Sequence, residues 1–288
     1  MKKNAPTTQQ IPNYQGGETV YEPPHGWLDL RLKQLWFYRE LLYFFVWRDL
    51  KVRYKQTMLG ATWAILQPVM TMIVFSIIFG KLVNIKPPSD IPYPVYTYVA
   101  LLPWQLFSGA IASASASLVN NQSMITKVYF PRLLLPLASV LSGLVDFAIA
   151  FLVLIGLMFY YHLTPTWAVL YLPLFILLAL VTALSVSLWL SAFNVKYRDF
   201  KYIVPFLLQF WMYATPVAYP SEIIPEKWQF IFALNPMTGV VEGFRWALLG
   251  QQSAVTSLLL LAIGIVTVIL IGGLIYFQRM EQTFADIV

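Results

Sequence analysis

Apolar residues in this chain gather into six long runs, and most polar residues lie in the stretches between them. A helix that spans a membrane needs about 20 mainly apolar residues. Prolines fall inside several runs, which membrane helices tolerate because neighbouring helices satisfy the freed backbone groups. The pattern predicts an all-α membrane protein with six transmembrane helices, at about residues 61–82, 95–118, 133–160, 167–193, 202–219 and 255–277.

The segment before the first run has a different pattern. Apolar side chains of residues 28–47 fall on one arc of a helix, although Arg39 interrupts it. The purely apolar part, Leu41 to Trp47, is seven residues long and too short to cross a bilayer. We therefore expect an amphipathic interface helix on the membrane surface, with a short helix packed on the protein as the alternative. Residues 1–27 are polar, contain several prolines and glycines, and predict a flexible tail.

The stretch from residue 220 to residue 254 fits neither a span nor a free loop. Pro220, Pro225, Pro236 and Gly239 interrupt it, yet it is rich in large apolar side chains. We expect two short helices, at about 225–233 and 237–249, that dip back into the outer leaflet. A pair of amphipathic helices on the outer surface is the alternative. Irregular backbone at membrane depth requires cover from protein or water.

Composition and charge support a membrane protein and give its orientation. Charged residues make up 11% of the 288 residues, against about 25% in soluble domains. Fifteen of the nineteen Lys and Arg residues lie in four segments that six spans would place on one side: 1–60, 119–132, 194–201 and 278–288. Because cytoplasmic loops carry the excess of Lys and Arg, both termini are predicted to be cytoplasmic. The excess of Lys and Arg is distributed by side of the membrane, so it does not indicate a nucleic-acid-binding protein.

Several kinds of chemistry have no candidate residues. The chain has no cysteine and no GxxxxGK[ST] phosphate loop, and His25 and His162 stand alone, so no metal or other cofactor is expected in it. If transport uses ATP, another polypeptide binds it. Asp146 is the only acid deep within a predicted span. An intramembrane carboxylate is a functional candidate by default, and a packing or hydrogen-bonding role, a pathway-lining role and proton coupling stay open.

Aromatic residues give the strongest side-chain signal, at 16% of the chain. Aromatic faces stack on the apolar faces of sugar rings, and their OH and NH groups hydrogen-bond hydroxyls. A path for a long hydrophilic glycan could be lined in this way; lipid-facing or packing aromatics are the alternative. The candidates for channel lining are Trp63, Phe75 and Phe79 in the first run and Tyr202, Phe206, Phe210, Trp211 and Tyr213 in the fifth.

Four stretches resemble a known family in order and in hydropathy. They read RDLKVRYKQTMLGATWAILQP at 48–68, KVYFPRLLLPL at 127–137, NVKYRDFKYIVPFLLQFWMYATPVAYP at 194–220 and NPMTGVVEGFRWALLG at 235–250. Over about residues 30–280 the chain is similar to the permease subunits of type-2 ABC polysaccharide exporters, which include O-antigen, capsule and teichoic acid exporters. The first 28 residues match nothing in the family core.

The resemblance implies a homodimer of six-span subunits with two copies of a separate ATPase subunit, which binds ATP and Mg. It implies an interface helix with a Leu-Gly loop at 28–60, a transmembrane domain at 61–277 and a cytoplasmic C-terminus at 278–288. Spans one and five would line the sugar channel. The residues implied to couple to the ATPase are Leu59 and Gly60, and Lys127, Tyr129 and Arg132 of a coupling helix at about 120–131. The helix pair at about 225–249 would form a periplasmic gate with Trp228, Phe232, Asn235, Pro236, Phe244 and Trp246.

The expected function is export of a lipid-linked, O-antigen-like polysaccharide across the bacterial inner membrane, by a channel subunit that is not an enzyme. Wall teichoic acid or capsule polymer are alternative substrates, and the spans hold no basic residue apart from Lys81 at the end of the first, which favours a neutral glycan. A membrane glycosyltransferase would need paired acids on a cytoplasmic loop, where Asp199 stands alone. An ion-coupled carrier would need more intramembrane charges than Asp146. A type-2 exporter of a drug or lipid fits the aromatic spans less well.

Overall fold

The computed structural model describes residues 36–55, 60, 62–88, 91–197, 199–251 and 255–287, and this part of the chain is built from helices and turns without strands. The longer helices are α2 (Arg39–Lys55), α3 (Thr62–Phe75), α4 (Tyr93–Asn120), α6 (Leu134–Tyr160), α7 (Leu172–Lys196), α8 (Phe200–Tyr213), α10 (Pro236–Leu249) and α11 (Val255–Ile287). The shorter ones are a π-helical turn η1 (Ser76–Leu82), α5 (Gln122–Ile125), the 3₁₀ turns η2 (Trp167–Tyr171) and η3 (Ser221–Ile223), and α9 (Glu226–Ala233).

Within the described residues, five helices are long and apolar enough to cross a membrane: Thr62–Leu82, Tyr93–Asn120, Leu134–Tyr160, Trp167–Lys196 and Ser257–Glu281. They correspond to the first four and the last of the six predicted runs. The described part of the chain is therefore all-helical, and its five long apolar helices make it a multi-pass membrane protein.

The fifth predicted run differs from expectation. Only its first part is helical, because α8 ends at Tyr213 after 14 residues, about 21 Å of helix. The chain then turns through Ala214–Tyr219. Pro216 disfavours the helical conformation of the residue before it and donates no backbone N–H, and Pro220 repeats the interruption. The run is long enough in sequence, but these prolines stop its helix early.

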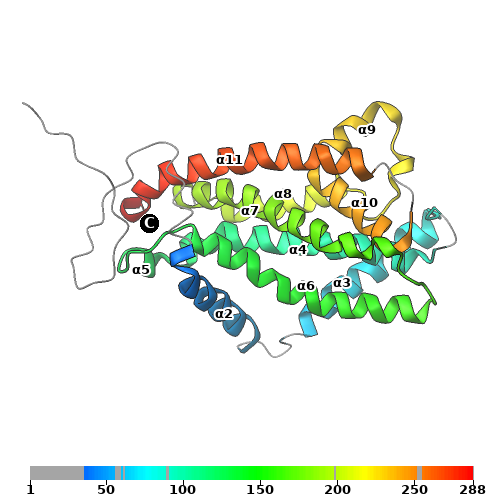
Figure 1. Ribbon diagram of the computed structural model, residues 1–288, viewed down its shortest axis with the longest axis horizontal. Helices are drawn as coiled ribbons and strands as arrows, with labels where there is room; N and C mark the ends of the chain where they lie inside the picture. The colour runs from blue at the N-terminus through cyan, green and yellow to red at the C-terminus, as the bar shows by residue number, and fades with distance from the viewer. Residues whose placement is uncertain are drawn as a thin grey trace, which may run out of the picture. The chain divides into compact units, whose positions relative to one another are not determined.

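Helix α4 forms the centre of the bundle. It is buried along most of its length, whereas the spans of α3 and α11 are buried along little of theirs. It packs against α3, α6, α7 and α10, and Figure 1 shows it between α7 and α6. The faces that α3 and α11 leave uncovered are apolar, as expected of surfaces that meet lipid or another subunit.

The helix before the first span runs further along the chain than predicted. Helix α2 extends from Arg39 to Lys55 and includes four basic residues of the motif at 48–68. It packs along α6 and buries Phe45, while Tyr43 and Trp47 are exposed. The N-terminal part of the prediction, residues 28–35, lies outside the described residues. Because α2 is attached to α6, its position depends on contacts within the protein.

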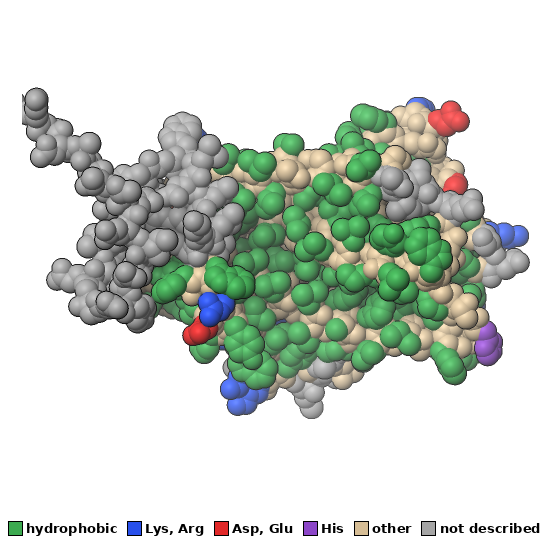
Figure 2. Space-filling view, in the orientation of Figure 1, with side chains coloured by type: hydrophobic (Ala, Val, Ile, Leu, Met, Phe, Trp, Pro, Cys, Tyr) green, Lys and Arg blue, Asp and Glu red, His purple; other side chains and the backbone are tan. Residues whose placement is uncertain are grey.

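The two ends of the bundle are built differently. At one end, which we call the α5 end, Phe45 of α2, Phe130 after α5, and Phe277 and Phe284 of α11 share one apolar cluster. At the other end, the α9 end, α9 and α10 follow α8 (Figure 1). On the face shown in Figure 2, hydrophobic side chains cover the middle of the molecule and charged side chains lie toward its ends.

Candidate transport pathway and its polar clusters

Four aromatic side chains form one exposed row on α8, which we call the α8 stripe: Tyr202, Phe206, Phe210 and Tyr213. Their spacing of four, four and three residues places them on the same face of the helix. Their exposed fractions lie between 53% and 72%. The neighbouring Trp211 belongs to the opposite, packed side: its ring lies edge-on to Phe107 with centroids 5.0 Å apart.

The aromatic candidates of the first span also separate into two groups. Trp63 is more than half exposed at the start of α3. Phe75 is buried in the main core, and its ring meets Phe79 edge-on with centroids 5.5 Å apart. In the single chain, Trp63 is therefore available to a ligand or partner, whereas Phe75 and Phe79 serve packing.

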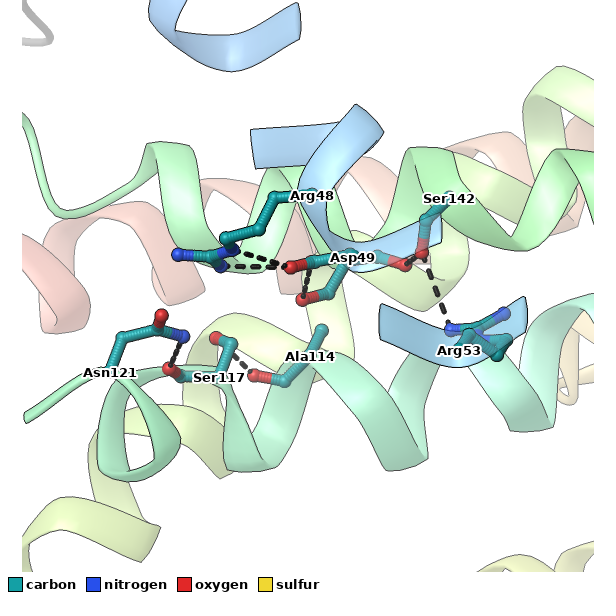
Figure 3. Close-up of polar contacts among 8 residues, drawn as sticks. Arg48, Asp49, Arg53, Ala114, Ser117, Asn121 and Ser142 are labelled. Atoms are coloured by element: carbon teal, nitrogen blue, oxygen red, sulfur yellow. Dashed lines mark hydrogen bonds and ion pairs between the residues drawn. The ribbon is translucent and has the colours of Figure 1, made fainter. Parts of the chain in front are cut away.

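A polar group joins the end of α2 to the middle of α6; we call it the α2–α6 cluster, and it consists of Arg53, Tyr54, Ser142 and Asp146. The Arg53 guanidinium forms an ion pair with Asp146 and donates to Ser142 Oγ at 3.4 Å (Figure 3). The Tyr54 hydroxyl donates to the other carboxylate oxygen of Asp146. Burial, followed by this hydrogen bond, raises the pKa of the Tyr54 phenol, so Tyr54 stays protonated as a donor. These contacts show Asp146 in a hydrogen-bonding role.

A second contact holds α2 one turn earlier. Arg48 donates to Asp49 Oδ1 at 2.8 Å, and its guanidinium lies 5.0 Å from the centre of the Phe45 ring. Ser139 of α6 donates to the other oxygen of Asp49 at 3.4 Å. Figure 3 shows this row of polar contacts along α2. Helix α2 is thus attached to α6 at two successive turns.

A cavity of about 710 Å³ lies beside the α2–α6 cluster, between α2, α3, α4 and α6. Trp63 and Gln67 line it from α3, and Gln105 and Ser108 line it from α4. Asp146 lines it from α6. Most of the other lining residues are small or apolar. The cavity therefore combines an apolar wall and an aromatic ring with a few amide, hydroxyl and charged groups.

The predicted ATPase-contacting residues of the segment after α5 lie at the α5 end. Lys127, Tyr129 and Arg132 line a hollow of about 230 Å³ after α5. The Arg132 backbone N–H donates to Glu281 Oε1 of α11 at 3.1 Å. The predicted helix at 120–131 is reduced to the four residues of α5, with turns around it.

Gly60 is the described half of the Leu-Gly joint, and Leu59 lies outside the described residues. Gly60 has φ of +43°, in the left-handed region that glycine enters without steric cost. The backbone between α2 and α3 therefore uses the freedom that glycine supplies.

Asn235 connects the end of α8 to the start of α10. Its side-chain oxygen accepts from the Met237 backbone N–H at 3.1 Å and from Trp211 Nε1 at 3.0 Å. Its amide nitrogen donates to Thr215 Oγ1 at 2.8 Å. An Asn at the N-cap followed by Pro236 is a favoured helix start. One side chain therefore fixes both the α10 cap and the turn after α8.

The other predicted gate residues lie in contrasting surroundings. On α9, Trp228 is exposed and Phe232 is partly buried. On α10, Phe244 is fully buried, and Trp246 packs edge-on to Trp167 with centroids 6.1 Å apart. Helix α10 is thus part of the core, whereas α9 is mainly uncovered.

A buried charged group on α10 was not anticipated from the sequence; we call it the α10 cluster, and it consists of Tyr96, Val217, Ser221, Glu242 and Arg245. Arg245 Nη1 lies 2.8 Å from Glu242 Oε1, and Nη2 donates to the Val217 carbonyl at 3.0 Å. Ser221 Oγ donates to the same Glu242 oxygen at 2.7 Å. The Arg245 guanidinium lies 3.9 Å from the centre of the Tyr96 ring. An acid and a base three residues apart on an otherwise apolar helix was the available signal.

Residues 40–249 match the model of the ABC-2 type transporter family. The chain belongs to the ABC-2 type transporter family. This membership confirms the family resemblance, and it makes the chain a transport subunit and not an enzyme. The glycosyltransferase alternative is therefore excluded.

The chain is also similar to curated transport proteins over most of its length. It is 31% identical to the O-antigen export system permease protein RfbA of Myxococcus xanthus, over 88% of this chain and 98% of that protein. It is 29% identical to the RfbA protein of Klebsiella pneumoniae, over 83% and 92%. It is also 26% identical to the polysialic acid transport protein KpsM of Escherichia coli, over 81% and 91%.

Proposed function

We propose that this chain is the channel-forming permease of an exporter that moves a lipid-linked, O-antigen-like polysaccharide across the bacterial inner membrane. The relatives named for O-antigen export support the substrate class. The observation that carries the proposal is the α8 stripe, a row of aromatic rings exposed on a transport subunit. Aromatic rings accept the apolar faces of sugars without the charges that would hold a glycan in place.

A homodimer would give the α8 stripe a partner surface. In the single chain, the side chains of the stripe and of Trp63 are each more than half exposed. Two copies that meet along α3 and α8 would place two such surfaces around one continuous path. That arrangement suits a glycan chain that is too long for a single closed cavity.

The proposed topology has six crossings with both termini in the cytoplasm. Five are the long helices, and the sixth is α8 together with the turn at 214–219. The α5 end then faces the cytoplasm, in agreement with its Lys and Arg residues. Helices α9 and α10 re-enter the outer leaflet as a periplasmic gate, in which Asn235 links the gate to the outer end of α8.

Transport is driven by two copies of a separate ATPase, which bind ATP and Mg. The proposed contacts are the turn at 126–132, with Lys127, Tyr129 and Arg132, and the Leu59-Gly60 joint. Because Phe45 of α2 packs on Phe130 with ring centroids 5.4 Å apart, movement of this turn would reach α2. From α2 it would pass through Gly60 to α3.

A capsule polymer is the second candidate substrate, because KpsM relatives transport polysialic acid by name. Polysialic acid is anionic, and a path for it would favour Lys or Arg along the stripe. Helix α8 has one basic residue, Lys201, at its start, where its ammonium lies 4.8 Å from the centre of the Tyr202 ring. The rest of the helix has none, which favours a neutral glycan. The same argument applies to wall teichoic acid.

The test removes two rings of the stripe and measures polysaccharide on the cell surface. Aromatic contacts contribute about 0.5–1.5 kcal/mol each, so Phe206→Ala with Phe210→Ala should lower the export rate by about tenfold. The matched control is Phe159→Ala, a similarly exposed ring on α6. Normal export by the double variant, at equal protein level, would contradict the proposed channel.

A further inference from the structure

The cavity between α2, α3, α4 and α6 has the features of a ligand site. Its volume of about 710 Å³ lies within the range of about 300–1,000 Å³ typical of small-molecule sites. Trp63 and Gln67 stand four residues apart on α3 and so share one face. Gln105 and Ser108 stand three residues apart on α4. Two helices therefore present amide and hydroxyl groups to the same space, beside an exposed indole ring.

The charges around the cavity select the chemistry of its ligand. Among the residues that line it, the charged side chains are Arg53 and Asp146, and they neutralise each other as an ion pair. A phosphate would meet the Asp146 carboxylate and would have to compete with it for Arg53. Sugar hydroxyls both donate and accept, as do the Gln amides and Ser hydroxyls. The lining suits an uncharged, hydroxyl-rich ring that stacks on Trp63.

We propose that this cavity is a binding site for a neutral sugar unit of the transported glycan, with Trp63 as its stacking platform and Gln67 and Gln105 as its hydrogen-bonding groups. The inference rests on the proposed function and adds a place where the saccharide is held. Trp63 belongs both to the cavity and to the span predicted to line the path. A sugar bound there lies against the first span and against the cluster that attaches α2 to α6.

Gly109 gives direct experimental access to the cavity. It lines the cavity from α4, and a Cβ built on it would meet nothing within 4 Å. The chain has no cysteine, so Gly109→Cys introduces the only thiol. Gly156 of α6 also has open space around its Cβ position and does not line the cavity, which makes Gly156→Cys the matched control.

The experiment measures labelling of each thiol by a charged, water-soluble methanethiosulfonate, in membrane vesicles that hold the permease with its ATPase. The probe is lipid-linked polysaccharide extracted from cells that lack the permease. At a probe concentration tenfold above its dissociation constant, occupancy should slow labelling of Gly109→Cys by about tenfold. Labelling of Gly156→Cys should not change. A Gly109→Cys thiol that does not react, or that reacts equally with and without probe, overturns the site.

Two further measurements distinguish binding of the sugar from binding of the lipid headgroup. Polysaccharide released from its lipid should protect the thiol, and the lipid carrier after removal of its glycan should not. Protection by the carrier alone would assign the cavity to the headgroup and overturn the proposal. If Gly109→Cys is not produced, Ala112→Cys on the same wall of α4 gives the same measurement.

A filling variant tests whether the site is used in transport. Gly109→Phe should place a ring in the cavity and lower surface polysaccharide, whereas Gly156→Phe should not. Export at the wild-type rate by Gly109→Phe would overturn the site while leaving the proposed function intact. Failure of the wild-type chain to export polysaccharide would instead remove the proposed function. The two failures are thus distinguishable.

Discussion

The α10 cluster and the α2–α6 cluster are each built around an arginine and a carboxylate, but their surroundings are opposite. Arg245 and Glu242 are neighbours on one helix, and their side chains are 0% and 5% exposed. Arg53 and Asp146 come from two helices that are far apart in the sequence, and both side chains are 34% exposed. The arginine–carboxylate pair at the α9 end is therefore enclosed by protein, whereas the pair between α2 and α6 is open to a cavity.

This difference implies two mechanical roles. The α10 cluster attaches the turn after α8 to the α10 core through Val217 and Ser221, and a charge enclosed there cannot be separated from its partner without large cost. The α2–α6 cluster borders a cavity, so water or a ligand can replace part of each contact if α2 moves. We infer that the α10 cluster stays closed during transport and that the α2–α6 cluster can open.

The largest expected effect comes from breaking the enclosed pair. Arg245→Met leaves the Glu242 carboxylate buried without its partner, which should lower stability by about 3–5 kcal/mol. The measurement is the temperature at which detergent-solubilised protein loses its monodisperse chromatographic peak. Glu242→Met combined with Arg245→Met removes both charges and should recover much of the loss. An Arg245→Met variant as stable as the wild type would show that the α10 cluster contributes little to stability.

The intermediate effect comes from the open pair. Asp146→Asn keeps the side-chain volume and removes the charge, and it should cost about 1–2 kcal/mol, since water compensates part of the lost contact. If this contact positions α2 during transport, Asp146→Asn should lower export by more than the loss of folded protein explains. An Arg53→Asp, Asp146→Arg exchange tests whether pairing itself matters, because partners in contact are non-additive by about 0.5 kcal/mol or more. If the stability changes of the two single variants simply add in the double variant, Arg53 and Asp146 are not coupled.

The sequence was sufficient for the features that depend on local pattern. Five of the predicted runs became long helices. The segment at 225–249 contains α9 and α10, close to the predicted positions. The four-residue spacing of Tyr202, Phe206 and Phe210 already placed them on one face.

Features that depend on packing between distant segments could not be read in the same way. Asp146 was visible as an isolated acid, but its pairing with Arg53 depends on how α2 lies against α6. The early end of α8 was within reach, since Pro216 marks it. The spacing alone places Trp211 on another face of α8 than its aromatic neighbours, but its hydrogen bond to Asn235 depends on how the chain folds after α8. Apolar periodicity identifies a face but not what covers it.

The smallest expected effect is the loss of one hydroxyl from the open cluster. Tyr54→Phe keeps the ring and removes the donor to Asp146, which should cost about 1 kcal/mol or less. Burial raises the pKa of Tyr54 in the folded protein, so its stabilising contribution is fully present below the ordinary tyrosine pKa of about 10 and declines as pH rises beyond it. The stability difference between wild type and variant should therefore be constant from neutral pH to about pH 9 and shrink above about pH 10. Tyr43→Phe, an exposed phenol on the same helix, should show no such difference, and an equal effect at both positions would mean that the hydroxyl of Tyr54 does not hold α2 on α6.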